Sequence, residues 1–179
     1  MKKTVPTTLL ILFSTFLFSQ SYNNTFSVTG GIFGDGFGGE ATFNNNLDEV
    51  SFTQIALDVS MDSFLVGDVS IPYSSYALSY SYFTTLYSTA RRMKVLSVGA
   101  GGVVGYELVN NGNNDLSNIV FVDGESKFIY GLQGTLEVDI IISEHYSLLV
   151  KTTQFYHVNS DFGKLTNYSG VGLRYYFNM

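Results

Sequence analysis

The sequence contains no cysteine and no tryptophan, and only 2 of its 179 residues are proline. Without cysteine the chain has no disulfide framework, no thiolate zinc site and no thiol nucleophile. Charged residues make up only 13% of the chain, and the 15 acidic residues outnumber the 9 basic ones, which gives a formal net charge of −6. Binding to a phosphate backbone requires a basic surface, so we expect no direct nucleic-acid binding.

The residue types that are abundant favour strands. There are 13 tyrosines, 15 phenylalanines and 18 glycines, and hydrophobic residues make up 45% of the chain. Aromatic residues are enriched in strands, and a chain of this length and hydrophobicity forms one folded body rather than a disordered segment or a coiled coil. The composition therefore predicts a single all-β domain.

The start of the chain has the pattern of a secretory signal peptide. A positive end, Met-Lys-Lys, precedes an almost wholly apolar segment at 9–18, and small or polar residues follow at 19–21. A membrane anchor is the alternative, but this apolar segment is shorter than the ~20 residues that a transmembrane helix needs. We therefore predict a cleaved signal over 1–20 and a mature domain over 21–179, in which no later segment offers 18 continuous apolar residues.

In the mature chain, apolar and polar residues alternate with the period of a β-strand. Over residues 128–140 the even positions hold Phe, Tyr, Leu, Gly, Leu, Val and Ile, whereas the odd positions hold Ile, Gly, Gln, Thr, Glu and Asp. Residues 94–108 and 171–177 show a similar separation into an apolar face and a face rich in glycine and polar residues. In a closed membrane barrel only every second side chain of a strand faces lipid, so this pattern predicts membrane-spanning strands.

The same alternation, followed along the whole chain, predicts eight strands. Their approximate ranges are 25–34, 37–45, 50–62, 72–86, 94–109, 127–140, 145–158 and 167–177. Small bacterial outer-membrane barrels use an even number of strands of about ten residues or more. We therefore predict an eight-stranded antiparallel up-and-down outer-membrane β-barrel that follows the signal peptide. The alternative is a soluble β-sandwich, whose strands also alternate.

The connections between these strands fit a barrel whose two termini lie in the periplasm. On that side the links are at 46–49, 87–93 and 141–144. On the other side they are at 35–36, 63–71, 110–126 and 159–166. Three of the four links in the second set are longer. Short periplasmic turns and longer outer loops are typical of outer-membrane barrels.

Five charged residues fall on the inward side of the last four predicted strands. They are Glu107, Glu137, Asp139, Lys151 and Arg174. A charge that faces lipid costs about 2–4 kcal/mol at the membrane midplane, so a barrel turns such groups into its lumen, where they need one another as partners. We predict a structural network of ion pairs that fills a barrel too narrow for a pore, with a transport role as the alternative.

The last predicted strand also has a clear apolar face. Leu173, Tyr175 and Phe177 share this face, two residues before the chain ends. A barrel in lipid must leave no strand edge unpaired, so we predict that this strand closes the barrel.

One short turn on the predicted periplasmic side concentrates basic charge. It contains Arg91, Arg92 and Lys94. This turn is a candidate docking site for an acidic partner, and a simple solvated turn is the alternative explanation of the same charges.

Three motifs suggest chemistry but have simpler explanations. Residues 34–39 match G-x-G-x-x-G, yet a strand pattern follows where a dinucleotide site needs a helix N-terminus, so we expect a glycine-rich hairpin. Residues 110–115 offer oxygens to calcium but only one carboxylate, so we expect an exposed loop. His157, Ser160 and Asp161 could form a lipid-cleaving site, but polar residues are usual at a strand end. We expect no catalytic residue, no cofactor and no metal site.

Three segments of the sequence resemble a known family. They are residues 102–107 (Gly-Val-Val-Gly-Tyr-Glu), 127–131 (Lys-Phe-Ile-Tyr-Gly) and 170–177 (Gly-Val-Gly-Leu-Arg-Tyr-Tyr-Phe). In this order, with a long polar loop between the first two, they are similar to the TraO conjugal transfer proteins of Bacteroidetes conjugative transposons. The similarity is best from about residue 72 to the end, and it carries over no catalytic or ligand residues.

The resemblance implies an accessory outer-membrane component of the apparatus that moves DNA between mating cells. Its role would be structural or docking, and its partners would be outer-membrane lipid and other proteins of the conjugation apparatus. The alternative function is that of a general small outer-membrane barrel, which binds surface partners or stabilises the envelope. A lipid-modifying enzyme is a third possibility.

Overall fold

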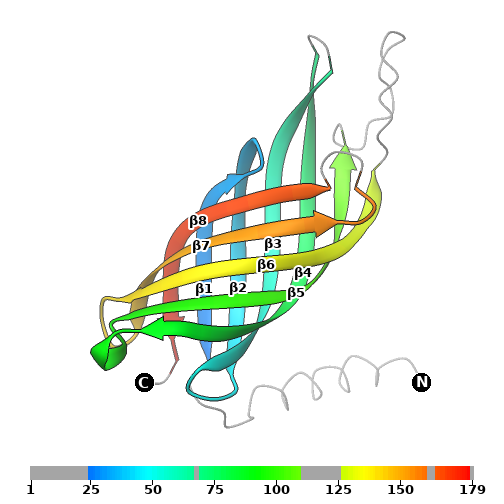
Figure 1. The fold of residues 1–179 in the computed structure, drawn as a ribbon. Coiled ribbons are helices and arrows are strands. Elements are labelled where there is room, and N and C mark those ends of the chain that lie inside the picture. Colours follow the sequence, from blue (N-terminus) through cyan, green and yellow to red (C-terminus); the bar gives the residue numbers. More distant parts are fainter. Residues whose placement is uncertain (1–23, 67–68, 110–125, 161–163, 178–179) are drawn as a thin grey trace, which may run out of the picture.

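The computed structural model describes residues 24–66, 69–109, 126–160 and 164–177. These residues form eight β-strands and one short 3-10 helix (Figure 1). The strands are β1 (Thr25–Phe33), β2 (Gly36–Asn46), β3 (Ser51–Val66), β4 (Val69–Ser88), β5 (Lys94–Val109), β6 (Lys127–Ile141), β7 (Tyr146–His157) and β8 (Leu165–Tyr176). The 3-10 helix η1 (Ala90–Arg92) lies between β4 and β5. The predicted signal peptide over 1–20 lies outside the described residues.

The strands close into an antiparallel barrel. Each strand pairs with the next one along the chain, and β8 pairs with β1, from Thr25 opposite Tyr176 to Phe33 opposite Tyr168. Every strand therefore has a hydrogen-bonded neighbour on both sides, as a membrane interior requires. The predicted eight-stranded up-and-down barrel is confirmed.

Among the described residues, no helix is long and apolar enough to cross a membrane.

Side chains alternate between the lumen and the outer wall, as the period of two predicts. In β6, Gln133 and Glu137 are 7% and 1% exposed, whereas Leu132 and Leu136 beside them are 64% and 42% exposed. Large aliphatic or aromatic side chains are exposed on the outer face of all eight strands. An apolar wall of this extent is suited to lipid rather than to water.

The two ends of the barrel differ in their connections. One end, called the terminal end here, holds the start of β1 and the end of β8. Its turns are 47–50, 89–93 and 142–145. The other end, called the loop end here, has the connections 34–35, 67–68, 110–126 and 158–164. The long connections of the chain are thus all at the loop end.

The prediction of a long connection over 63–71 was wrong. β3 continues to Val66 and β4 begins at Val69, and the two residues are opposite each other in the register. The segment contains valine, isoleucine and phenylalanine, which favour extended strands. The hairpin therefore extends further from the barrel than the sequence pattern suggested (Figure 1).

The glycine-rich motif at 34–39 forms the hairpin between β1 and β2 that the sequence predicts. Gly34 has a φ of 59°, in the left-handed region that glycine adopts without strain. Its backbone N–H donates to the carbonyl of Asn167 in β8 at 2.8 Å. The turn is therefore bonded to the strand that closes the barrel.

The lumen is filled by side chains in two layers. Toward the loop end, the rings of Phe33 and Phe155 stack with their centroids 5.4 Å apart. Toward the terminal end, Phe52 stacks on Phe83 at 4.8 Å, and Gly99 leaves room for this pair because a Cβ there would lie 2.6 Å from the Phe83 ring. Buried polar and charged side chains occupy much of the rest of the lumen. The interior of an eight-stranded barrel is just wide enough to be filled in this way.

Candidate functional site

The first charged cluster in the lumen centres on Arg174 of β8, which is 3% exposed. Its Nη2 donates to Glu137 Oε1 at 2.9 Å, and its Nη1 donates to Asp139. Glu137 and Asp139 are two residues apart on β6, so both side chains point inward. The guanidinium carbon also lies 5.9 Å from the centre of the Phe52 ring, and Ser147 donates its hydroxyl to Asp139 Oδ1 at 2.7 Å. The guanidinium is therefore buried and paired with both carboxylates.

The second cluster centres on Lys151 of β7. Its Nζ donates to Glu40 Oε1 at 2.5 Å and to Gln54 Oε1 at 3.0 Å. The Nε2 of Gln54 donates to Glu137 Oε2 at 3.5 Å. Gln54 thus connects the Lys151 cluster to the Arg174 cluster across the lumen.

The lumen contains more carboxylates than cations. Asp58 of β3 lies opposite Glu40 in the register and is 4% exposed, and no N–H or hydroxyl group of the described residues donates to its carboxylate oxygens. The buried acidic residues of the described chain are Glu40, Asp58, Glu107, Glu137 and Asp139, and its buried lysine and arginine are Lys151 and Arg174. The interior is therefore acidic, which disfavours the entry of phosphate groups.

The structure brings together three of the five predicted lumen residues. Arg174, Glu137 and Asp139 are in direct contact, whereas the ion-pair partner of Lys151 is Glu40 of β2. The sequence prediction had considered only the last four strands and therefore missed Glu40.

The fifth predicted residue, Glu107, lies apart from the two clusters. Its Oε1 accepts the hydroxyl of Ser160 at 2.7 Å, and in the register Glu107 stands opposite Lys127. These contacts place Glu107 near the loop end, where β5 ends and β6 begins.

Glu40 and Asp58 could have been found by the same alternation rule. In β2, Glu40 has the same parity as the buried Thr42, and in β3, Asp58 has the same parity as the buried Gln54. The rule would have placed both carboxylates in the lumen. It could not have shown that Glu40 meets a lysine of β7.

The predicted closing residues lie on the outer wall. Leu173 and Phe177 are exposed, and the ring of Tyr175 lies 5.3 Å from both Tyr146 and Phe177. Beyond the end of β8, the backbone N–H of Phe177 donates to the carbonyl of Asn24 at 3.1 Å. The last strand therefore stays bonded to the first up to the terminal end.

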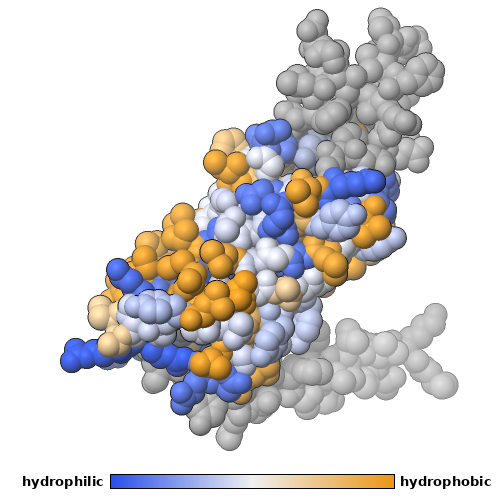
Figure 2. All heavy atoms as spheres, viewed as in Figure 1, coloured by the Kyte–Doolittle hydropathy of each residue, from blue (hydrophilic) through white to orange (hydrophobic). Residues whose placement is uncertain are grey.

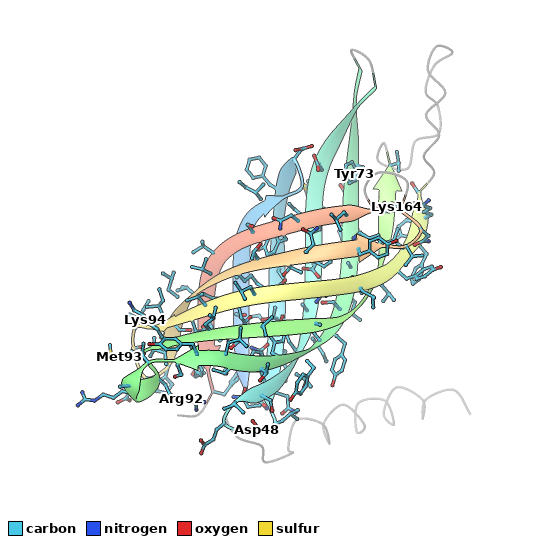
Figure 3. The ribbon with its side chains drawn as sticks, in the orientation of Figure 1. Asp48, Tyr73, Arg92, Met93, Lys94 and Lys164 are labelled. Carbon is cyan, nitrogen blue, oxygen red and sulfur yellow. The ribbon has the colours of Figure 1, made fainter. Side chains whose placement is uncertain are left out.

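The predicted docking turn includes the 3-10 helix η1. Arg91 and Arg92 have φ values of 64° and 52°, in the left-handed region that non-glycine residues rarely adopt. Arg92 donates through Nη2 to the backbone carbonyl of Glu49 in the neighbouring turn, and Arg91, Arg92 and Lys94 are all exposed. Figure 3 shows Arg92 and Lys94 at the terminal end, with Asp48 on the adjacent turn.

A cavity of about 590 Å³ opens at the terminal end beside this turn. Its lining includes Phe52, Asp139 and Arg174 from the lumen, together with Glu49 and Arg92 from the turns. The charged cluster of Arg174 is thus the inner wall of a vestibule whose rim is made by the turns.

Asp48 stabilises the turn between β2 and β3. Its Oδ1 accepts the backbone N–H groups of Val50 and Ser51 at 2.8 and 2.7 Å, and its Oδ2 accepts the Ser51 hydroxyl at 2.5 Å. The hydroxyl of Ser51 and then these backbone N–H groups hold the pKa of Asp48 below its ordinary value of 3.8. The carboxylate is therefore ionised and fixed at the rim of the vestibule.

The residues considered for a lipid-cleaving site are engaged elsewhere. Ser160 donates its hydroxyl to Glu107, and the ring of His157 stacks on Phe155 at 5.7 Å. Asp161 and the candidate calcium loop at 110–115 lie outside the described residues. Within the described ranges, no group of three or more His, Asp or Glu side chains could hold a metal ion.

The wall of the barrel has eight strands, is closed, is apolar outside and is lined inside by polar and charged side chains. This is the architecture of a small outer-membrane β-barrel protein. The sequence model for conjugative transposon protein TraO matches residues 24–177. The chain belongs to the TraO family, as its sequence segments suggested. It is therefore a conjugative transposon protein with the fold of an outer-membrane barrel.

Solved structures support the fold. The N-terminal barrel of OprF from Pseudomonas aeruginosa is 11% identical with a TM-score of 0.60, and the alignment covers 88% of this chain and 98% of that one. A major outer-membrane protein of Thermus thermophilus is 12% identical with a TM-score of 0.62, covering 87% and 99%. The attachment invasion locus protein Ail of Yersinia pestis is 9% identical with a TM-score of 0.58, covering 88% and 100%. No curated protein sequence matches the chain.

Proposed function

We propose that the protein is a structural and docking component of the conjugative transfer apparatus, without enzyme activity, and that it does not conduct DNA. The filled lumen is the observation that carries this proposal. Two ion-pair clusters joined through Gln54 cross the barrel, and the aromatic layer of Phe33 and Phe155 lies beyond them. DNA would have to break these contacts and would then meet an excess of buried carboxylates.

The proposed docking surface is the terminal end, which we place in the periplasm. Its short turns and the two barrel termini are the features that outer-membrane barrels direct to the periplasm. Proteins of a transfer apparatus that cross the envelope would approach the barrel from this side. The strained backbone of Arg91 and Arg92 supports a binding role, because residues in rarely populated backbone conformations are concentrated at functional sites.

The test is a mating assay with charge-reversed donors. Arg91→Glu reverses a charge on the docking turn, and Lys164→Glu makes the matched change at an exposed site at the opposite end of the barrel (Figure 3). We expect Arg91→Glu to lower the transfer frequency at an unchanged membrane level of the protein, whereas Lys164→Glu transfers like the parent. Equal transfer by both variants would remove the docking turn from the proposal.

A second arm of the assay uses donors that lack the protein. If they transfer normally but grow poorly under detergent stress, the apparatus role is wrong and a general role in envelope stability takes its place. If transfer fails and growth is normal, the apparatus role stands. Immunoblots of outer-membrane fractions confirm the level of the protein in each strain.

A further inference from the structure

The outer wall of the barrel contains a polar island on β7 and β8. Thr152 and Gln154 of β7 point outward, and in the register they stand opposite Ser169 and Asn167 of β8. The four side chains lie partway along the strands, not at the ends. None of them is charged, so each is able both to donate and to accept a hydrogen bond.

Apolar residues lie on both sides of this island along the strands. Val150 stands opposite Val171 toward the terminal end, and Tyr156 stands opposite Leu165 toward the loop end. All four are exposed on the outer wall. Figure 2 shows the same arrangement, with a pale and blue area over β7 and β8 between two hydrophobic areas. The island therefore lies inside the apolar band rather than at a membrane surface.

The hydrogen bonds within the island leave part of its polar capacity unused. Thr152 and Ser169 join through their hydroxyls at 3.0 Å, and the Ser169 hydroxyl donates to Asn167 Oδ1 at 3.1 Å. Asn167 Nδ2 donates to the Thr152 hydroxyl at 3.3 Å, and that hydroxyl also lies 3.2 Å from the carbonyl of Tyr168. Gln154 donates through Nε2 to the carbonyl of Thr166 at 2.9 Å, and among the described residues its Oε1 has no bond. Hydrocarbon chains offer no hydrogen bonds, so lipid would leave the Oε1 of Gln154 unsatisfied.

A shallow groove of about 340 Å³ runs beside the island across β6, β7, β8 and β1. Its lining includes Thr152 and Ser169 of the island, and also Gly30, Leu136 and Val171. At Gly30 an added Cβ would meet nothing within 4 Å, so the wall is recessed there. A recessed, mostly apolar surface with a polar edge allows another protein to approach closely within the membrane.

We propose that this face of β7 and β8 is the contact surface of a homodimer, in which a second copy of this chain covers the polar island. Two copies inserted in the same direction are related by a twofold axis along the membrane normal, so each island meets the other at the same depth. Amide and hydroxyl groups without charge complement themselves in such a contact. The charge of an ionic partner would find no opposite charge on this face, which favours a second copy over an ionic partner.

The inference is independent of the role in conjugation and can be tested in membranes. The chain has no cysteine, so any disulfide comes from an introduced residue. We expect Asn167→Cys to form a cross-linked dimer on oxidation in native outer membranes. Ala100→Cys, on the exposed outer face of β5, is the matched control and should remain monomeric. Equal cross-linking at both positions, no product at Asn167, or a product with the mass of another protein would overturn the homodimer.

A second variant tests the chemistry of the contact. The double substitution Gln154→Leu and Asn167→Leu makes the island apolar and better suited to lipid. We expect the purified protein to lose the dimer in sedimentation measured in detergent. The folded state of this variant is checked by its faster migration when unboiled than when boiled on a denaturing gel, which a closed barrel shows. A folded variant that remains dimeric would refute the proposed role of the polar groups.

Discussion

Among the described residues, the two buried cations of the lumen each lie beside two carboxylates, but they differ in how many of these carboxylates they bond. Arg174 contacts both Glu137 and Asp139 through separate nitrogens. Lys151 pairs with Glu40, whereas no N–H or hydroxyl group of the described residues donates to Asp58 beside it. The number of charges is the same in the two clusters, and the geometry of the cation makes the difference.

This difference follows from the shapes of the two side chains. A guanidinium is a planar group with donors pointing in several directions, so it can bond two carboxylates at once. An ammonium is a compact charge, and that of Lys151 is already bonded to Glu40 and Gln54. Both carboxylates of the arginine cluster are therefore bonded to their cation, whereas only Glu40 of the lysine cluster is bonded to its cation, which predicts opposite responses to neutralising mutations.

The largest expected effect is that of removing Arg174. Arg174→Leu leaves Glu137 and Asp139 buried without their cation, and breaking a buried pair costs about 3–5 kcal/mol. We expect a fall of this size in the free energy of unfolding, measured by urea titration of the barrel in detergent. Arg91→Leu, which removes an exposed arginine, is the control and should change stability little. An unchanged midpoint for Arg174→Leu would show that this cluster does not stabilise the lumen.

The comparison is sharpened by neutralising one carboxylate in each cluster. Asp139→Asn weakens the ion pair with Arg174 and should lower the free energy of unfolding by about 1–3 kcal/mol. Asp58→Asn removes a carboxylate that no donor satisfies, and its new amide can donate to Glu40. We therefore expect Asp58→Asn to preserve or raise stability in the same titration. If Asp58→Asn lowered the free energy of unfolding more than Asp139→Asn, the proposed difference between the two clusters would be wrong.

The smallest expected effect concerns an exposed carboxylate outside the lumen. The pKa of Asp48 is lowered by the donors of Ser51 and Val50, so its ionised form is favoured in the folded state. This contribution is present above the ordinary value of 3.8 and is lost as the pH falls through the lower, folded pKa. We expect Asp48→Asn to be slightly less stable than the parent at pH 7, with the difference vanishing at acidic pH. Thermal unfolding followed at several pH values measures it.

The accuracy of the strand predictions depended on how regular the alternation is. Residues 94–109 match β5, and 127–140 match β6 to within one residue, because apolar and polar residues alternate over most of these segments. The end of β3 and the start of β4 were missed because these residues form a hairpin beyond the part of the barrel that shows clear alternation. Parity cannot locate a strand end where the two faces no longer differ.

The polar island was also missed from the sequence. Thr152, Gln154, Asn167 and Ser169 lie on two separate strands, and each pair alone is an ordinary interruption of an apolar face. Their cluster exists only because β7 and β8 pair in one particular register. A shift of one residue in the pairing would turn these side chains to the other face.

By itself, the sequence determined which side chains face lipid and which face the lumen, because a strand sends successive side chains to opposite faces. It also placed charged groups in the interior, since lipid cannot accommodate them. Only the tertiary structure decided which of these groups meet. Lys151 and Glu40 are 111 positions apart and come from β7 and β2, which are not neighbours in the sheet. Closure of the barrel brings their side chains together across the lumen. The local alternation of residues along a strand does not show which side chains meet across the lumen.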